Sequence, residues 1–160
     1  MREGYDVMQV CVNGHQINSS AQSMPQFNQP FCDQCGAETI TACPECRTPI
    51  PGYYYASGVL SVSRVPVPNN CTQCGVAYPW RQATLASAVE IFELELDGQD
   101  ASDAAALLPL IASDNPRTEV AALKLKRLMS KMAKPAYDIT IKVISDLASE
   151  TAKKTFGMKP

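Results

Sequence analysis

Four short segments between Cys11 and Cys74 decide how this chain folds: CVNGH at 11–15, CDQC at 32–35, CPEC at 43–46 and CTQC at 71–74. Together they contain all seven cysteines and the single histidine of the 160 residues. Seven cysteines cannot all be paired in disulfides, whereas eight ligands form two tetrahedral sets of four, as structural zinc requires. We therefore predict two structural zinc ions per chain, with these ligands: Cys11, His15, Cys32, Cys35, Cys43, Cys46, Cys71 and Cys74.

The local sequence around each ligand pair is typical of a zinc knuckle. Asn13-Gly14 is a strong signal for a hairpin turn, and it lets Cys11 and His15 face one metal. A glycine follows the second cysteine at Gly36 and Gly75, where the chain must reverse in a left-handed conformation, but Arg47 replaces it in the third knuckle. The alternation of residues predicts strands at 5–12, 37–42 and 59–67, and a turn-rich connection at 49–58.

The four ligand pairs can be wired in two ways. The spacing favours sequential sites, with the first two pairs on one ion and the last two on the other. A cross-brace, as in RING domains, would instead combine the first and third pairs. RING domains keep the second and third pairs almost adjacent, whereas residues 36–42 separate those pairs here.

At Tyr78-Pro79-Trp80 the cysteines end and helical periodicity begins. We predict helices at 80–97, from Ser102-Asp103 to Leu108, at 116–134 and at 136–156, with Asn115-Pro116 as a start signal. The fold class is therefore α+β: a double zinc-ribbon module of knuckles and a short hairpin at 1–78, and an all-α region of three to four helices at 79–160. The apolar face of 136–156 is wide, which predicts either a helical bundle or a homo-oligomer through this helix.

The knuckle motifs resemble a known group of proteins. FCDQCGAETITACPEC (31–46) followed by CTQCGVAYPW (71–80) is similar to uncharacterised bacterial proteins with an N-terminal zinc-ribbon pair and a helical C-terminal tail. The resemblance covers about residues 9–81 and implies two zinc sites. It implies no activity.

Charge and motif content argue against several classes of function. Residues 1–78 carry three basic and five acidic residues; two Zn²⁺ and seven thiolates would bring the net charge to about −5. Such a module repels phosphate, so nucleic-acid binding, if it occurs, falls to the basic face of the third helix at Lys124, Arg127, Lys131 and Lys134. There is no phosphate loop or nucleophile elbow, and the only histidine is assigned to zinc, so we do not expect an enzyme.

We therefore expect a non-enzymatic zinc-binding adaptor that binds another protein, with exposed tyrosines among 53–55 as contact residues. The alternatives are a nucleic-acid-associated zinc ribbon and a RING-like module that recruits a conjugating enzyme. No apolar run approaches the ~20 residues of a membrane span, and the N-terminus lacks a signal peptide, so we expect a cytoplasmic protein without membrane partners.

Overall fold

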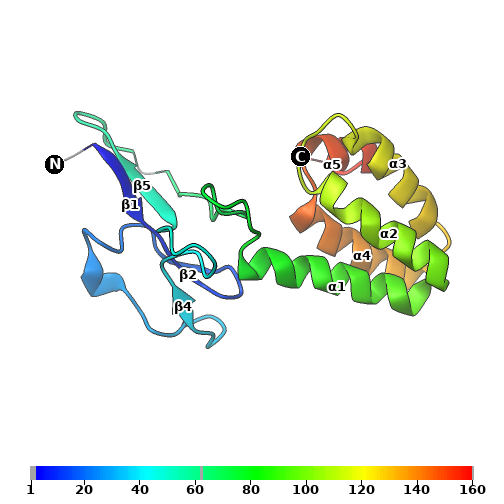
Figure 1. Ribbon diagram of the computed structural model, residues 1–160, viewed down its shortest axis with the longest axis horizontal. Helices are drawn as coiled ribbons and strands as arrows, with labels where there is room; N and C mark the ends of the chain where they lie inside the picture. The colour runs from blue at the N-terminus through cyan, green and yellow to red at the C-terminus, as the bar shows by residue number, and fades with distance from the viewer. Residues whose placement is uncertain (1–2, 62, 160) are drawn as a thin grey trace. The chain divides into compact units, whose positions relative to one another are not determined.

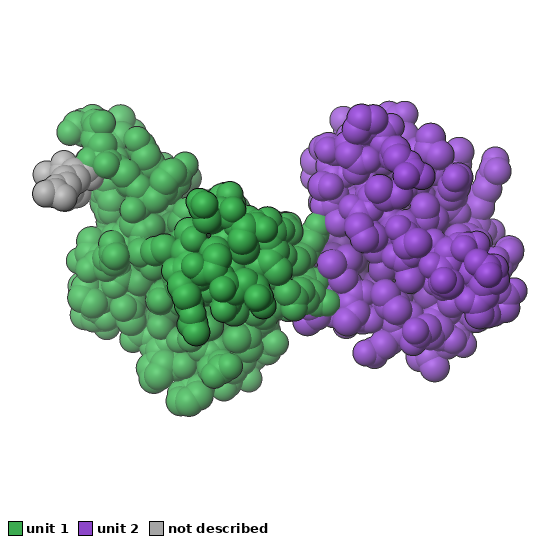
Figure 2. Space-filling model, in the orientation of Figure 1, with its two compact units in different colours: residues 1–82 green, residues 83–160 purple. Residues whose placement is uncertain are grey.

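The computed structural model describes residues 3–61 and 63–159. The chain divides into two compact units, Met1–Gln82 and Ala83–Pro160 (Figure 2). The strands lie in the first unit and the helices from α2 onward in the second (Figure 1), which confirms the α+β class. Helix α1 (Pro79–Glu95) begins in the first unit, so the division falls within its first turn and not before it.

Unit 1 contains two small sheets. Strands β2 (Gln9–Cys11) and β3 (Gln16–Asn18) form the hairpin predicted by Asn13-Gly14, and β4 (Thr39–Ile40) pairs with the other edge of β2. A short 3₁₀ helix, Pro25–Phe27, lies in the loop that follows. Strand β1 (Gly4–Val7) pairs antiparallel with β5 (Pro51–Tyr55) in a separate two-stranded sheet.

One strand prediction is wrong. The described residues of 59–67 form no strand, and residue 62 lies outside the described residues. The predicted connection at 49–58 instead contains β5. Its tyrosines alternate as strand residues do: Tyr53 contacts Tyr55 along one face, and Tyr54 contacts Tyr5 of β1 on the other. Of the two candidate segments, 51–55 became a strand because it pairs with β1, which lies far away in the sequence.

The core of unit 1 is small and surrounds one group of cysteines. Met8, Val10, Ile50 and Tyr78 are fully or almost fully buried there, together with Cys43 and Cys71. Trp80, in the first turn of α1, stacks on Tyr78 with ring centroids 4.8 Å apart. The start of α1 is thus anchored by aromatic packing to the knuckle module.

Unit 2 contains the remainder of α1 and four further helices. They are α2 (Gly98–Ile111), α3 (Thr118–Met129), α4 (Lys134–Leu147) and α5 (Glu150–Phe156). The described chain thus has five α-helices where the sequence predicted three to four, because the predicted helix at 136–156 is divided in two. Of the described residues, no helix has the length and apolar character needed to cross a membrane.

The caps explain these differences. Asp97 accepts a hydrogen bond from the Asp100 N–H, so α2 begins at Gly98, before the predicted start at Ser102-Asp103, and passes through these two residues. Pro109 lies so near the end of α2 that the helix continues to Ile111. Ser149 caps α5 by accepting from the Ala152 N–H, and this divides the predicted helix at 136–156 in two.

The apolar face of α4 and α5 is buried in the core of unit 2. Ile144, Leu147, Ala152 and Phe156 pack there with residues of the other helices, such as Leu125. The wide apolar face predicted for 136–156 is thus buried within a helical bundle, which is one of the two arrangements that the sequence predicted. The same core needs no metal ligand, since all eight predicted ligands lie in unit 1.

Candidate metal centres

The first group of ligands forms at the end of the β2–β3 hairpin. Cys11 ends β2, and the turn at Asn13-Gly14 returns the chain so that His15 Nδ1 lies 3.5 Å from Cys11 Sγ. The second knuckle adds Cys32 Sγ, 3.6 Å from the same nitrogen, and Cys35 Sγ, 3.8 Å from Cys11 Sγ. The four ligand atoms lie within 4.8 Å of one another, close enough to share one ion.

The second group combines the third and fourth knuckles. Cys43 Sγ lies 3.8 Å from Cys74 Sγ, and Cys46 Sγ lies 3.6 Å from Cys71 Sγ. Their four sulfurs also lie within 4.8 Å of one another. In each group two of the three or four cysteines are buried, and the last cysteine, Cys35 or Cys74, is exposed.

The structure thus brings together all eight residues that the sequence singled out, and it groups them sequentially. The first and second pairs form one group, and the third and fourth pairs form the other. The cross-brace, on which the RING-like alternative depends, is not found among the described residues. Each group can hold one metal ion.

Three of the knuckles have the same backbone hydrogen bonds. The residue after the second cysteine donates its N–H to the carbonyl of the first cysteine, as Gly36 does to Cys32 at 2.8 Å. The first cysteine in turn donates its N–H to a carbonyl five residues further along, as Cys32 does to Ala37. Such a turn directs further N–H groups toward the sulfurs, as the Gln34 N–H does toward Cys32 Sγ at 3.4 Å. The peptide dipoles then favour thiolate over thiol.

Two polar side chains support the sulfurs, and the sequence did not single them out. Asn13 Nδ2 donates to Cys35 Sγ at 3.4 Å, and Thr48 Oγ1 lies 3.1 Å from Cys46 Sγ. Their positions in the sequence were the one feature that could have identified them. Asn13 lies in the hairpin turn between two ligands, and Thr48 lies two residues after the last ligand of a knuckle. Asn13 cannot be identified without knowing that its turn approaches Cys35 of the second knuckle, whereas Thr48 contacts a sulfur of its own knuckle, two residues away.

The local contacts shift the pKa values of the cysteines in opposite directions. The Ala37 N–H and the Asn13 amide lower the pKa of Cys35 to about 6. The Thr48 hydroxyl and backbone N–H lower the pKa of Cys46 to about 6. The pKa of Cys74 is raised to about 12. The Val76 N–H lowers it, but partial desolvation of the sulfur and the neighbouring thiols at Cys46, Cys71 and Cys43 together raise it by more.

These shifts show that the sulfurs of one group cannot all ionise together without a cation between them. Some sulfurs are stabilised as thiolates, and the remaining ones resist ionisation because like charges would then lie less than 4 Å apart. Burial likewise raises the pKa of Cys11 in the first group. A divalent cation at the centre removes this conflict, because it neutralises the thiolates that surround it.

Comparison with known proteins gave one match. A family model described as "Uncharacterized protein conserved in bacteria (DUF2321)" matches residues 4–156, which covers both units. No curated protein and no solved structure matches the chain.

Proposed function

The chain belongs to this family of uncharacterised proteins conserved in bacteria, and we propose that it is a non-enzymatic zinc-binding adaptor with two structural zinc ions. The observation that carries the proposal is the closed ligand set: four protein atoms surround each centre. A catalytic zinc keeps one coordination position for water or substrate, whereas structural zinc is bound by four protein ligands.

The distances within each group support zinc as the ion. Tetrahedral zinc with Zn–S bonds of about 2.3 Å and Zn–N bonds of about 2.0–2.1 Å separates two sulfurs by about 3.8 Å and a sulfur from a nitrogen by about 3.5 Å. In the structure, sulfurs of one group lie 3.6–3.8 Å apart, and the sulfurs of Cys11 and Cys32 lie 3.5–3.6 Å from His15 Nδ1. Four soft thiolates, or three with one imidazole, also select zinc or iron over Mg²⁺ and Ca²⁺.

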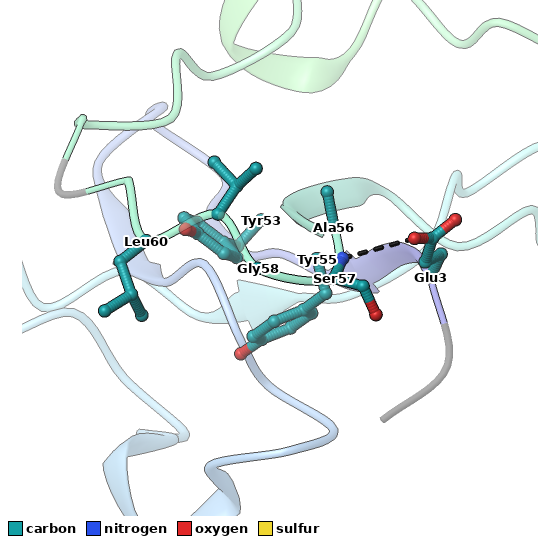
Figure 3. A pocket seen from close by; sticks show the side chains of 8 residues that line it. Glu3, Tyr53, Tyr55, Ala56, Ser57, Gly58 and Leu60 are labelled. Carbon is teal, nitrogen blue, oxygen red and sulfur yellow. Dashed lines mark hydrogen bonds between the residues drawn. The ribbon is translucent and has the colours of Figure 1, made fainter.

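The surface of unit 1 supports binding to another protein. A pocket of about 420 Å³ lies beside the end of β5, lined by Tyr53, Tyr55 and the following loop (Figure 3). Hydrogen bonds hold the loop in place: Ser57 N–H donates to Glu3 Oε1, and Tyr53 Oη donates to the Ser61 carbonyl. Leu60, at the pocket, is fully exposed. Val59 beside it is also exposed and lines the pocket, and a contiguous apolar patch, unlike a single apolar side chain, is typical of a protein contact surface.

The proposal is tested first by elemental analysis of reduced, purified protein. We expect two zinc ions per chain and no visible absorption band of iron–thiolate centres. A content of one ion or none, or iron in place of zinc, would contradict the zinc part of the proposal.

The adaptor part is tested by comparing the proteins that the chain captures from bacterial extract. We expect the double variant Tyr53→Ala/Leu60→Ser to lose a captured protein and to keep its zinc content. The matched control is Phe27→Ser, which removes an exposed aromatic side chain of unit 1 outside this pocket. Identical capture by wild type and double variant would contradict the assignment of this surface.

A further inference from the structure

Helices α2 and α3 leave a groove of about 490 Å³ between them on the surface of unit 2. Ala106 and Leu107 of α2 and Leu128 of α3 give it apolar walls, and Lys124 and Arg127 lie along its α3 side. The opposite side of α3, including Ala122 and Met129, is buried in the core. Helix α3 therefore presents a second, mixed apolar and basic face to the groove.

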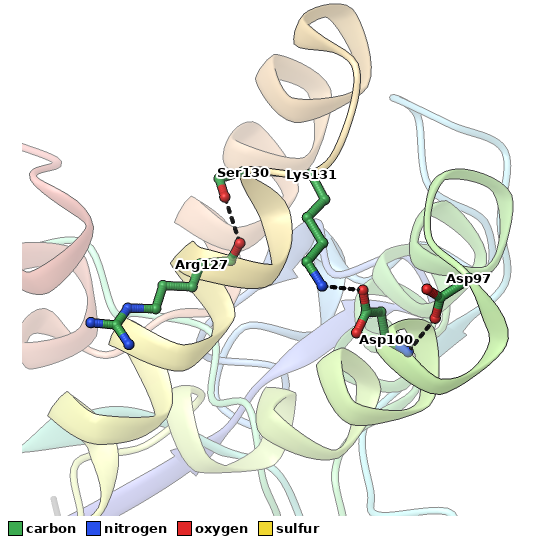
Figure 4. Close-up of polar contacts among 5 residues, drawn as sticks. All are labelled: Asp97, Asp100, Arg127, Ser130 and Lys131. Atoms are coloured by element: carbon green, nitrogen blue, oxygen red, sulfur yellow. Dashed lines mark hydrogen bonds and ion pairs between the residues drawn. The ribbon is translucent and has the colours of Figure 1, made fainter.

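The charge of the groove remains positive after its internal pairs are counted. Lys131 forms an ion pair with Asp100, and Arg127 extends away from that pair (Figure 4). Asp103, the acidic residue of the lining, accepts a hydrogen bond from Gln99. Among the described residues, Lys124 and Arg127 have no ion pair. The groove thus offers two available cations beside an apolar floor.

The exposed apolar residues of α3 favour a helix over a phosphate backbone as the occupant. Val120 and Leu123 are about half exposed, and they precede Lys124 and Arg127, respectively, by four residues, so all four share one face. A phosphodiester chain would gain nothing from these side chains, whereas an acidic amphipathic helix would contact both the apolar and the charged residues.

The chain itself carries a helix with this complementary pattern. At the C-terminal end of α1, Glu90 and Glu93 are exposed without an ion pair among the described residues, and Leu94 beside them is 83% exposed. Glu90 and Glu93 are three residues apart, as Lys124 and Arg127 are on α3. Three residues span about 4.5 Å along either helix, so the two charges of one pair can face the two of the other.

We propose that α1 of one copy docks in the α2–α3 groove of a second copy. Glu90 and Glu93 pair with Lys124 and Arg127 across the interface, and Leu94 covers the apolar floor at Leu107 and Leu128. Each copy offers one α1 face and one groove, so a two-fold dimer satisfies both at once. All these residues lie in unit 2, so the inference does not depend on the metal or on the proposed adaptor function.

The test is sedimentation velocity of the zinc-loaded full chain over a range of concentrations. We expect a concentration-dependent dimer, and at least a tenfold weaker association for Lys124→Glu/Arg127→Glu and for Glu90→Lys/Glu93→Lys. Leu94→Ala, which keeps the charge, should weaken association about tenfold. The control Lys126→Glu/Lys142→Glu makes the same charge change at exposed lysines outside the groove and should associate like wild type.

Mixing the two charge-reversed variants gives the decisive result. Each variant repels itself, but in the mixed pair both contacts join an acidic to a basic face, so association should return to the wild-type level. This recovery also shows that the variants are folded. A wild-type chain that stays monomeric, charge-reversed variants that associate like wild type, or a mixture that does not recover would each overturn the proposal. Salt-resistant binding of a labelled DNA or RNA duplex by monomeric wild type, abolished by Lys124→Glu/Arg127→Glu, would assign the groove to nucleic acid and also overturn it.

Discussion

Arg47 and Gly75 hold equivalent positions in the two knuckles of the second ligand group. Their φ angles are +64° and +76°, and each donates its N–H to the carbonyl of the first cysteine of its knuckle at 2.9 Å. Among the described residues, Arg47 is the one non-glycine residue with a positive φ. The knuckle therefore holds Arg47 in a left-handed backbone conformation that residues with a side chain disfavour.

Replacing Arg47 with glycine should stabilise the protein. The left-handed conformation costs a non-glycine residue roughly 1–2 kcal/mol, and part of this gain is lost to the greater freedom of glycine in the unfolded chain. We expect Arg47→Gly to raise the free energy of unfolding of unit 1 by about 0.5–1 kcal/mol. Chemical denaturation of zinc-loaded protein measures the change. The reciprocal variant Gly75→Ala should be destabilised, and equal stability of both variants would contradict this account.

Gly14 should not tolerate a side chain. Its φ is +92°, and a Cβ at this position would lie 3.0 Å from Cβ of Trp80. Since Trp80 is buried against Tyr78, it cannot move aside without disturbing the small core. We expect Gly14→Ala to lower the free energy of unfolding of unit 1 by about 1–3 kcal/mol. The control for backbone strain alone is Gly58→Ala, because Gly58 also has a positive φ but has open space around it.

Metal removal should unfold unit 1 and leave unit 2 folded. Unit 1 has a small core that surrounds metal ligands, whereas the core of unit 2 contains none. A structural zinc contributes apparent binding free energy of about 10–16 kcal/mol in small peptides. With a strong chelator we expect the near-ultraviolet circular dichroism signal of Trp80 to be lost while most of the helical signal remains. Loss of both signals together would show that the units depend on each other.

Zinc binding should release protons at pH 7.5, because Cys74, with a pKa of about 12, and Cys11, with a raised pKa, are protonated before the ion binds. Cys35 and Cys46, with pKa values of about 6, are already mostly ionised and release little. Affinity should therefore fall as the pH falls, and more steeply below about pH 6, where these two thiols are also protonated. Calorimetry in buffers of different ionisation enthalpy measures the release; binding without proton release at pH 7.5 would contradict these pKa values.

A cavity in the core of unit 2 should not affect the metal centres. Leu125 is fully buried among the helices of that unit. Leu125→Ala should lower the free energy of unfolding of unit 2 by about 2–5 kcal/mol through lost packing and the cavity left behind. The zinc content of the purified variant should remain that of wild type. A reduced zinc content would show coupling between the units.

The sequence by itself determined the ligands and their local geometry. Ligand pairs three or four residues apart, followed by residues that reverse the chain, specify knuckles through short-range contacts alone, and the Asn13-Gly14 turn specified the β2–β3 hairpin in the same way. The helical periodicity after Pro79 likewise indicated the helical second half, since one helix face repeats within a few residues.

The tertiary structure decided what depends on distant partners. The spacing favoured the sequential grouping of the ligand pairs, and the structure has this grouping and not the cross-brace. The segment 51–55 became β5 because β1 was available to pair with it. The left-handed turn at Arg47 formed without glycine because the ligand group and its hydrogen bonds fix the backbone there. The polar support from Asn13 likewise depends on packing across two knuckles, because this side chain reaches Cys35 of the second knuckle, whereas Thr48 contacts Cys46 of its own knuckle two residues away.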